Sequence, residues 1–158
     1  MARLTRQRGF ILWELLLACA VLLSAAGFLF VQGEAVTSQY YKRQVRVAAQ
    51  VLASDLRALQ QRALYKGSNV TRKLQPLNAD KSVYTLVDGM NRFATIAFSD
   101  FGCGEVYFQR SIASVSFGTL GAPTANGEYV LRHRRLGDFS CRVALQPVTG
   151  RVLVYEGE

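Results

Sequence analysis

The feature that most constrains this chain is a long apolar run from Phe10 to Val31. As a helix, these 22 residues would be about 33 Å long, enough to cross a hydrocarbon layer of about 30 Å. Glu14 is the only charged residue in the run. A carboxylate inside a membrane span is costly, so it usually has a function and a partner. We therefore expect a transmembrane helix over residues 10–31 with a functional glutamate near its start.

A short leader with three arginines precedes the apolar run and ends at Gly9. This leader, Gly9, Phe10 and the spacing to Glu14 together resemble the class III signal of type IV prepilins and pseudopilins. In that family, cleavage follows the glycine, the new first residue is usually Phe, and the fifth mature residue is Glu. The resemblance implies a leader peptide at 1–9, cleavage between Gly9 and Phe10, and N-methylation of Phe10 by the prepilin peptidase/N-methylase.

The resemblance also implies a role for Glu14 in assembly. Cleavage creates a free α-amine on Phe10, and the glutamate of a neighbouring subunit would attract it. The space between packed helices has a low dielectric constant, so burying an unpaired carboxylate there is costly. A nearby ammonium group offsets much of that desolvation cost. The chain departs from the family pattern at Ile11 and Trp13, where Thr and Ile or Leu are common, but these positions lie outside the three marker residues.

The helical pattern continues beyond the membrane run and becomes amphipathic over residues 32–66. Apolar residues recur at spacings of three and four, which is typical of one buried helix face. They are Val45, Ala48, Leu52, Leu56, Leu59 and Ala63. Gly67 stands where a C-cap glycine would end the helix. We expect one helix from Phe10 to Lys66, followed by a β-rich globular domain over residues 67–158.

Short alternating apolar runs separated by Gly, Pro and Asp predict strands in this domain. They lie at 83–87, 92–98, 105–108, 115–117, 128–132, 139–145 and 151–155. The last two form a hairpin with a turn at Pro147–Gly150. We predict an α+β fold in which the long helix packs on a small antiparallel β-sheet, as in pilins. The final hairpin is similar to that of the branch containing pseudopilin H, FimT and ComGD.

Cys103 and Cys141 both lie in the expected outward-facing domain. A disulfide between them would close a loop of about 39 residues and stabilise the fold by about 3–4 kcal/mol. The alternative is two unpaired thiols, because the sequence does not show whether the two Cα atoms are close.

Arg132, Arg134 and Arg135 form the densest basic cluster, with His133 between them. Such a cluster could contact nucleic-acid phosphates, and the competence branch handles DNA, but a solvated loop between strands is the simpler interpretation. His133 is the only histidine, which argues against a zinc site, and we expect no cofactor. No nucleophile triad or phosphate loop is apparent, so we expect a structural protein and not an enzyme.

The leader arginines place the N-terminus on the cytoplasmic side, so the C-terminal domain should face outward from a single-pass inner-membrane protein. Without these three arginines, the net charge of +8 falls to +5. The resemblance implies a minor pseudopilin or pilin-like subunit of a type II secretion, type IV pilus or competence machine. Its partners would be other pilins or pseudopilins and the inner-membrane assembly platform.

Three alternatives stay open at this point. One is a membrane-tethered DNA-binding subunit for natural transformation. Another is a Sec-exported protein or lipoprotein with an unrelated β domain, because the sequence around Cys19 and Ala20 imitates both kinds of cleavage site. The third is an ordinary membrane anchor in which Gly9 and Glu14 are incidental.

Overall fold

The computed structural model describes residues 6–66, 72–77, 80–88 and 91–157. Within the helix, the side chains at 6–11, 29–32 and 66 lie outside this description, as does that of residue 72. The chain divides into two units, an N-terminal unit over Met1–Gln39 and a globular unit over Tyr40–Glu158.

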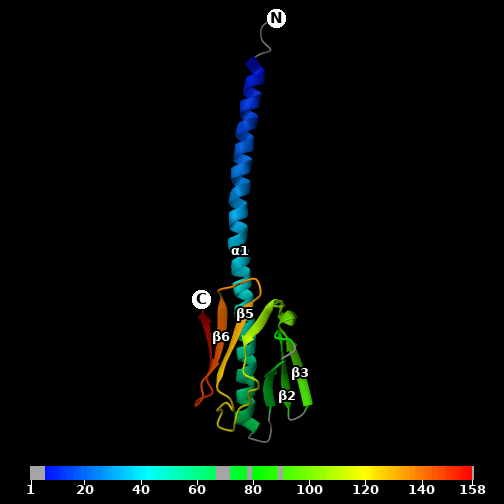
Figure 1. Cartoon of the computed structure of the whole chain (residues 1–158), viewed down its shortest axis with the longest axis vertical. Coiled ribbons are helices and arrows are strands. Elements are labelled where there is room, and N and C mark those ends of the chain that lie inside the picture. Colours follow the sequence, from blue (N-terminus) through cyan, green and yellow to red (C-terminus); the bar gives the residue numbers. More distant parts are fainter. Residues whose placement is uncertain (1–5, 67–71, 78–79, 89–90, 158) are drawn as a thin grey trace. The chain divides into compact units, whose positions relative to one another are not determined.

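A single helix, α1 (Arg6–Lys66), contributes to both units (Figure 1). Within the described residues α1 is helical from Arg6, four residues before the predicted start at Phe10, to Lys66, the last residue of the predicted helix. The sequence is rich in Leu, Ala, Arg and Gln, which are good helix formers. The expected C-cap, Gly67, lies outside the described residues.

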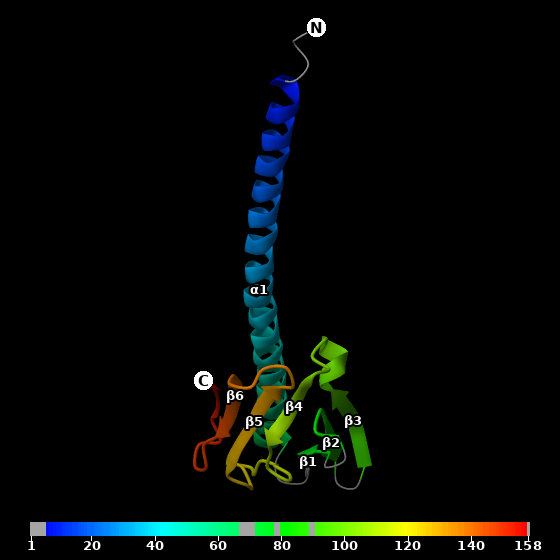
Figure 2. The same ribbon diagram turned by 45° about the horizontal axis from the view of Figure 1, so that its top comes forward.

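The strands of the globular unit form two antiparallel sheets, and not the single sheet predicted (Figure 2). The three-stranded sheet has the order β1-β2-β3 and the four-stranded sheet the order β4-β5-β6-β7. The bounds are β1 (Arg72–Pro76), β2 (Val83–Asp88), β3 (Asn91–Ala97), β4 (Val106–Arg110), β5 (Gly127–His133), β6 (Ser140–Leu145) and β7 (Val152–Gly157).

The division into two sheets arises directly after β3. A short 3-10 helix, η1 (Phe98–Phe101), follows that strand and ends at Gly102, whose φ of 71° is left-handed and favours glycine. The Cys103 amide donates to the Phe98 carbonyl at 2.9 Å and closes the turn. The chain is thereby redirected, and β4 pairs with β5 instead of β3.

Six of the seven predicted strands are confirmed within a few residues. The predicted strand at 115–117 is wrong, because this segment forms only isolated bridges, Leu74 with Val115 and Phe117 with Pro123. Strand β1, in which Leu74 and Pro76 are buried, was not predicted from the sequence. The predicted turn before β7 is confirmed: the Gly150 amide donates to the Gln146 carbonyl at 2.9 Å.

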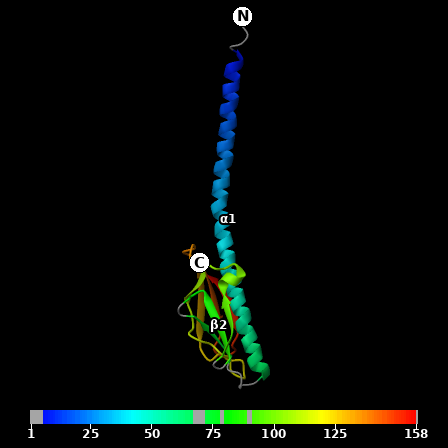
Figure 3. The same ribbon diagram turned by 90° about the vertical axis from the view of Figure 1, so that its right-hand side faces the viewer.

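The core lies between the sheets and the part of α1 that belongs to the globular unit (Figure 3). The predicted apolar stripe is fully confirmed, since all six of its residues are buried. The strands and η1 contribute an aromatic cluster made of Tyr84, Phe98, Phe108 and Tyr129, in which the ring centroids in contact are 5.1 to 6.3 Å apart. The Tyr84 hydroxyl donates to the Asp55 carboxylate of α1, so the helix and a strand are also joined by a polar contact.

Candidate functional site

The N-terminal unit presents an apolar helix surface. The described side chains from Leu12 to Phe28 are all exposed, and this part of α1 is long and apolar enough to cross a membrane. The large apolar ones are Leu12, Trp13, Leu15, Leu16, Leu17, Val21, Leu22, Leu23 and Phe28. Exposed apolar surfaces of this extent are typical of sites of contact with lipid or with other proteins.

Glu14 lies in this surface. Residues four apart share a helix face, so Glu14 stands in one row with Ala18 and Leu22. The neighbouring row contains Trp13, Leu17 and Val21, and the two rows together border a shallow hollow. The small side chain of Ala18 leaves the carboxylate accessible from the side of the helix. A carboxylate in this setting can accept hydrogen bonds from an ammonium group presented by an adjacent helix.

Gly9 and Phe10 lie within the helical bounds of α1, but their side chains are outside the described residues. The predicted cleavage between them and the methylation of Phe10 stay predictions. Glu14 is therefore the one member of the predicted processing and assembly set whose side chain can be placed.

The structure does not bring the predicted basic cluster together on one surface. Arg132, which the predicted strand at 128–132 includes, and His133 both belong to the end of β5, so the solvated-loop interpretation is wrong for His133. Arg132 borders a groove on the sheet, whereas the Arg135 guanidinium donates to the Tyr41 hydroxyl of α1 at 3.3 Å. Between them, the Arg134 amide donates to the Glu105 carbonyl at 3.0 Å.

His133 is buried, and its contacts hold β5 against α1. Its Nδ1 accepts from the Arg135 amide at 3.1 Å, so its Nε2 carries the proton and donates to Gln44 Oε1 at 2.9 Å. The imidazole also stacks on Tyr41, with ring centroids 4.4 Å apart. Burial lowers the pKa of His133, an effect opposed by the nearby Glu105 and reinforced by Arg135. These contacts hold a neutral imidazole that joins β5 to α1.

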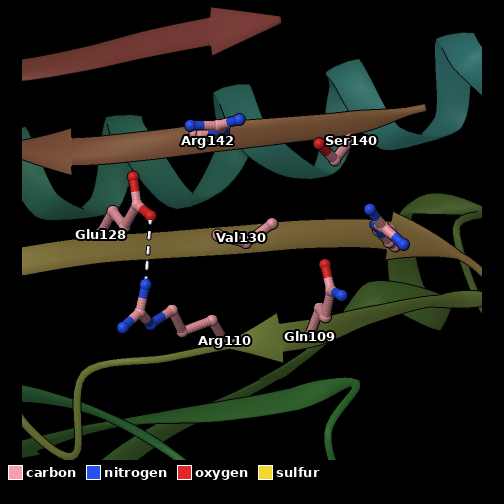
Figure 4. Close-up of a pocket in the computed structure, with 7 residues that line it drawn as sticks. Gln109, Arg110, Glu128, Val130, Ser140 and Arg142 are labelled. Atoms are coloured by element: carbon pink, nitrogen blue, oxygen red, sulfur yellow. Dashed lines mark ion pairs between the residues drawn. The ribbon is translucent and has the colours of Figure 1, made fainter. Parts of the chain in front are cut away.

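The sequence analysis missed a groove on the face of the four-stranded sheet that is turned away from α1 (Figure 4). We call it the arginine groove, and its lining residues are Gln109, Arg110, Glu128, Val130, Arg132, Ser140 and Arg142. They come from three adjacent strands, β4, β5 and β6. No sequence signal joins Arg142 to Arg110, which is 32 positions away.

The predicted disulfide is not formed. Cys103 and Cys141 are free, buried thiols. Cys103 lies after η1 with its sulfur 3.4 Å from the Gln44 carbonyl, whereas Cys141 lies on β6 between Leu131 and Glu156 of the adjacent strands. Burial raises the pKa of both thiols, that of Cys141 to about 11, so neither has the thiolate character of a reactive cysteine.

Across the part of the chain that the structure describes, no group of three or more His, Cys, Asp or Glu side chains is arranged to hold a metal ion. Comparison with models of protein families, with curated proteins and with solved structures finds no match to this chain.

Proposed function

We propose that this chain is a minor pseudopilin or pilin-like subunit of a type IV filament machine, processed after Gly9 and incorporated by packing of its N-terminal helix. The observation that carries the proposal is the ordered signature of basic leader, Gly9, Phe10 and Glu14 at the head of an apolar helix. The exposed apolar surface of that helix supports the same role, because it suits lipid before assembly and neighbouring helices afterwards.

In this proposal the chain is inserted once in the cytoplasmic membrane, with the globular unit outside. The three leader arginines support the orientation, since positive residues are retained on the cytoplasmic side. The machine would be a type II secretion system, a type IV pilus or a competence pseudopilus. Its components that contact this chain would be the prepilin peptidase/N-methylase, other pilins or pseudopilins and the assembly platform.

The decisive experiment is to determine the mature N-terminus. The full chain with a C-terminal tag is co-expressed with a prepilin peptidase, purified in detergent and measured by intact mass and N-terminal peptide mass spectrometry. We expect a chain that starts at Phe10 and carries one methyl group on its α-amine. A chain starting at a lipid-modified Cys19, or after Ala20 or Ala26, would overturn the proposal in favour of an exported β domain.

Glu14 gives a second test at the level of assembly. We expect Glu14→Ala to leave cleavage after Gly9 unchanged and to lower incorporation into filaments at least tenfold, because removing one partner of a buried charge pair costs about 3–5 kcal/mol. The measurement is the amount of variant in sheared filaments relative to its amount in the membrane. The isosteric Glu14→Gln is the control for charge: it should be defective as well. Wild-type incorporation of both variants would contradict the proposed role.

A further inference from the structure

We propose that the arginine groove is a binding site for the carboxylate groups of an acidic segment of a partner protein. The groove lies on the outer face of β4, β5 and β6, opposite the face that packs on α1 (Figure 4). This proposal does not depend on the filament role, since it concerns only the globular unit.

A β-bulge in β4 builds one side of the groove. Strand β4 alternates regularly through Val106 and Phe108, which are buried, so Arg110 would be expected to point inward as well. The register shifts between Phe108 and Arg110, and both Gln109 and Arg110 are exposed on the outer face. Bulges commonly re-aim a side chain next to a functional site. Here the bulge places a third arginine beside the two on β5 and β6.

The other two arginines are placed by the pairing of β5 with β6. Arg132 is opposite Ser140, and Arg142 is opposite Val130, so the two arginines are diagonal neighbours on adjacent strands. Diagonal positions are about 7–8 Å apart at the backbone, within reach of long side chains. Two guanidinium groups at this spacing can donate to one carboxylate or to two successive ones.

The polar groups of the groove are incompletely satisfied. Arg132 Nε is buried and has no hydrogen-bond partner in the structure. A buried donor without an acceptor is costly, so a turn of the Arg132 side chain that brings its guanidinium N–H groups to an oxyanion in the groove would be favoured. Over the described residues, Arg132 and Arg142 form no ion pair. Arg110 has only a long contact with Glu128, whose Oε1 lies 3.6 Å from Arg110 Nη1.

The charge distribution favours a carboxylate over a nucleic-acid backbone. Three arginines and Glu128 give the groove a net charge of +2, confined to one small area. A nucleic-acid strand brings a phosphate at every nucleotide and is bound by an extended positive surface. Glu128 would repel such a strand, and Arg135, three positions after Arg132, lies against Tyr41 and not in the groove. Spaced carboxylates can avoid Glu128 and still reach Arg132 and Arg142.

The test measures binding of a labelled acidic peptide to the full chain in uncharged detergent micelles. The probe is fluorescein-labelled hexaglutamate, followed by fluorescence anisotropy at low salt, with hexaglutamine as the uncharged comparison. We expect wild type to bind hexaglutamate and not hexaglutamine. Arg132→Gln and Arg142→Gln should each weaken binding about tenfold or more, since each removes charge-assisted hydrogen bonds to a carboxylate.

Arg92→Gln is the matched control, because Arg92 is exposed on β3 in the other sheet and its replacement removes the same charge. It should leave the affinity for hexaglutamate within twofold of wild type. Arg110→Gln provides a third groove variant, and because Arg110 is exposed we expect its replacement to leave the fold intact. Circular dichroism identifies any variant that is not folded.

Two results would overturn the proposal. In the first, hexaglutamate does not bind, or it binds equally to wild type, Arg110→Gln and Arg142→Gln. In the second, a labelled oligothymidylate binds more tightly than hexaglutamate and is lost in the same variants, which would assign the groove to phosphates. Neither result bears on processing at Gly9, so failure of this proposal is distinct from failure of the proposed function.

Discussion

His133 shows how a single buried residue couples this fold to pH. The imidazole accepts from the Arg135 amide and donates to Gln44, so protonation of Nδ1 would break the first of these hydrogen bonds. Burial lowers the pKa of His133 below its ordinary value of 6.5. The neutral form therefore contributes stability that is fully present above pH 6.5 and is lost as the pH falls through the folded-state pKa. We expect the free energy of unfolding in urea to decrease over that interval.

The control for this pH dependence is His133→Gln, which keeps an amide donor for Gln44 and does not titrate. Its free energy of unfolding should change less than that of wild type as the pH falls from 6.5. The groups that face His133 are Tyr41, Gln44, Glu105 and Arg135, and none of them is altered in the variant. An equal decrease in both proteins would show that another group is responsible.

The candidate sites differ in how far the sequence predicts individual residues. Glu14 was apparent because it is the one charge in an apolar run, a signal contained in consecutive residues. The arginine groove was not, because it depends on the register of β5 with β6 and on the bulge in β4. Neither the register nor the bulge can be predicted from consecutive residues alone. A shift of one residue in the pairing of two strands would turn every side chain of a strand to the other face of the sheet. The burial of His133 was missed for the same reason.

At the scale of elements, the turn between β6 and β7 has little tolerance for change. Gly150 has a φ of 66°, and a Cβ at this position would overlap the carbonyl oxygen of Gly121. We expect Gly150→Ala to destabilise the globular unit by about 2–4 kcal/mol, combining left-handed strain with overpacking. Urea unfolding measures the change. Gly137→Ala is the control, because an added Cβ there meets no atom within 4 Å; an equal loss in both variants would contradict this explanation.

The elements themselves were largely predictable, because hydrophobic periodicity is a local property. Apolar residues spaced three or four positions apart predicted the buried stripe of α1, and apolar residues spaced two apart predicted six of the strands. Strand β1 was missed because Arg, Lys, Gln and Pro surround its single buried leucine. Its place depends on partners elsewhere: Leu74 pairs with Leu86 of β2 and bridges to Val115. Division into two sheets likewise follows from the turn at Gly102.

At the scale of the molecule, the globular unit begins inside the helix, at Tyr40, and not at residue 67 where the sequence pattern changes. Helical residues form a large part of its core, namely Val45, Ala48, Ala49, Leu52, Ala53, Leu56, Leu59 and Ala63. A chain beginning at Tyr40 should therefore fold, whereas one beginning at residue 67 should not. The loss of the three buried leucines alone would cost about 2–5 kcal/mol each. Together this is comparable to the whole free energy of unfolding of a typical domain, about 5–15 kcal/mol.

Cooperative urea unfolding and near-ultraviolet circular dichroism would distinguish these two chains. For residues 40–158 we expect one sharp transition and a structured aromatic signal from the cluster around Tyr84 and Phe108. For residues 67–158 we expect no cooperative transition, because the face of the sheets that packs on α1 would be exposed to water. Leu52→Asp in the longer chain is the matched control and should also abolish folding, since it buries an unpaired charge. A cooperative transition in the shorter chain would mean that the sheets are stable without the helix, and that the buried stripe of α1 serves attachment and not folding.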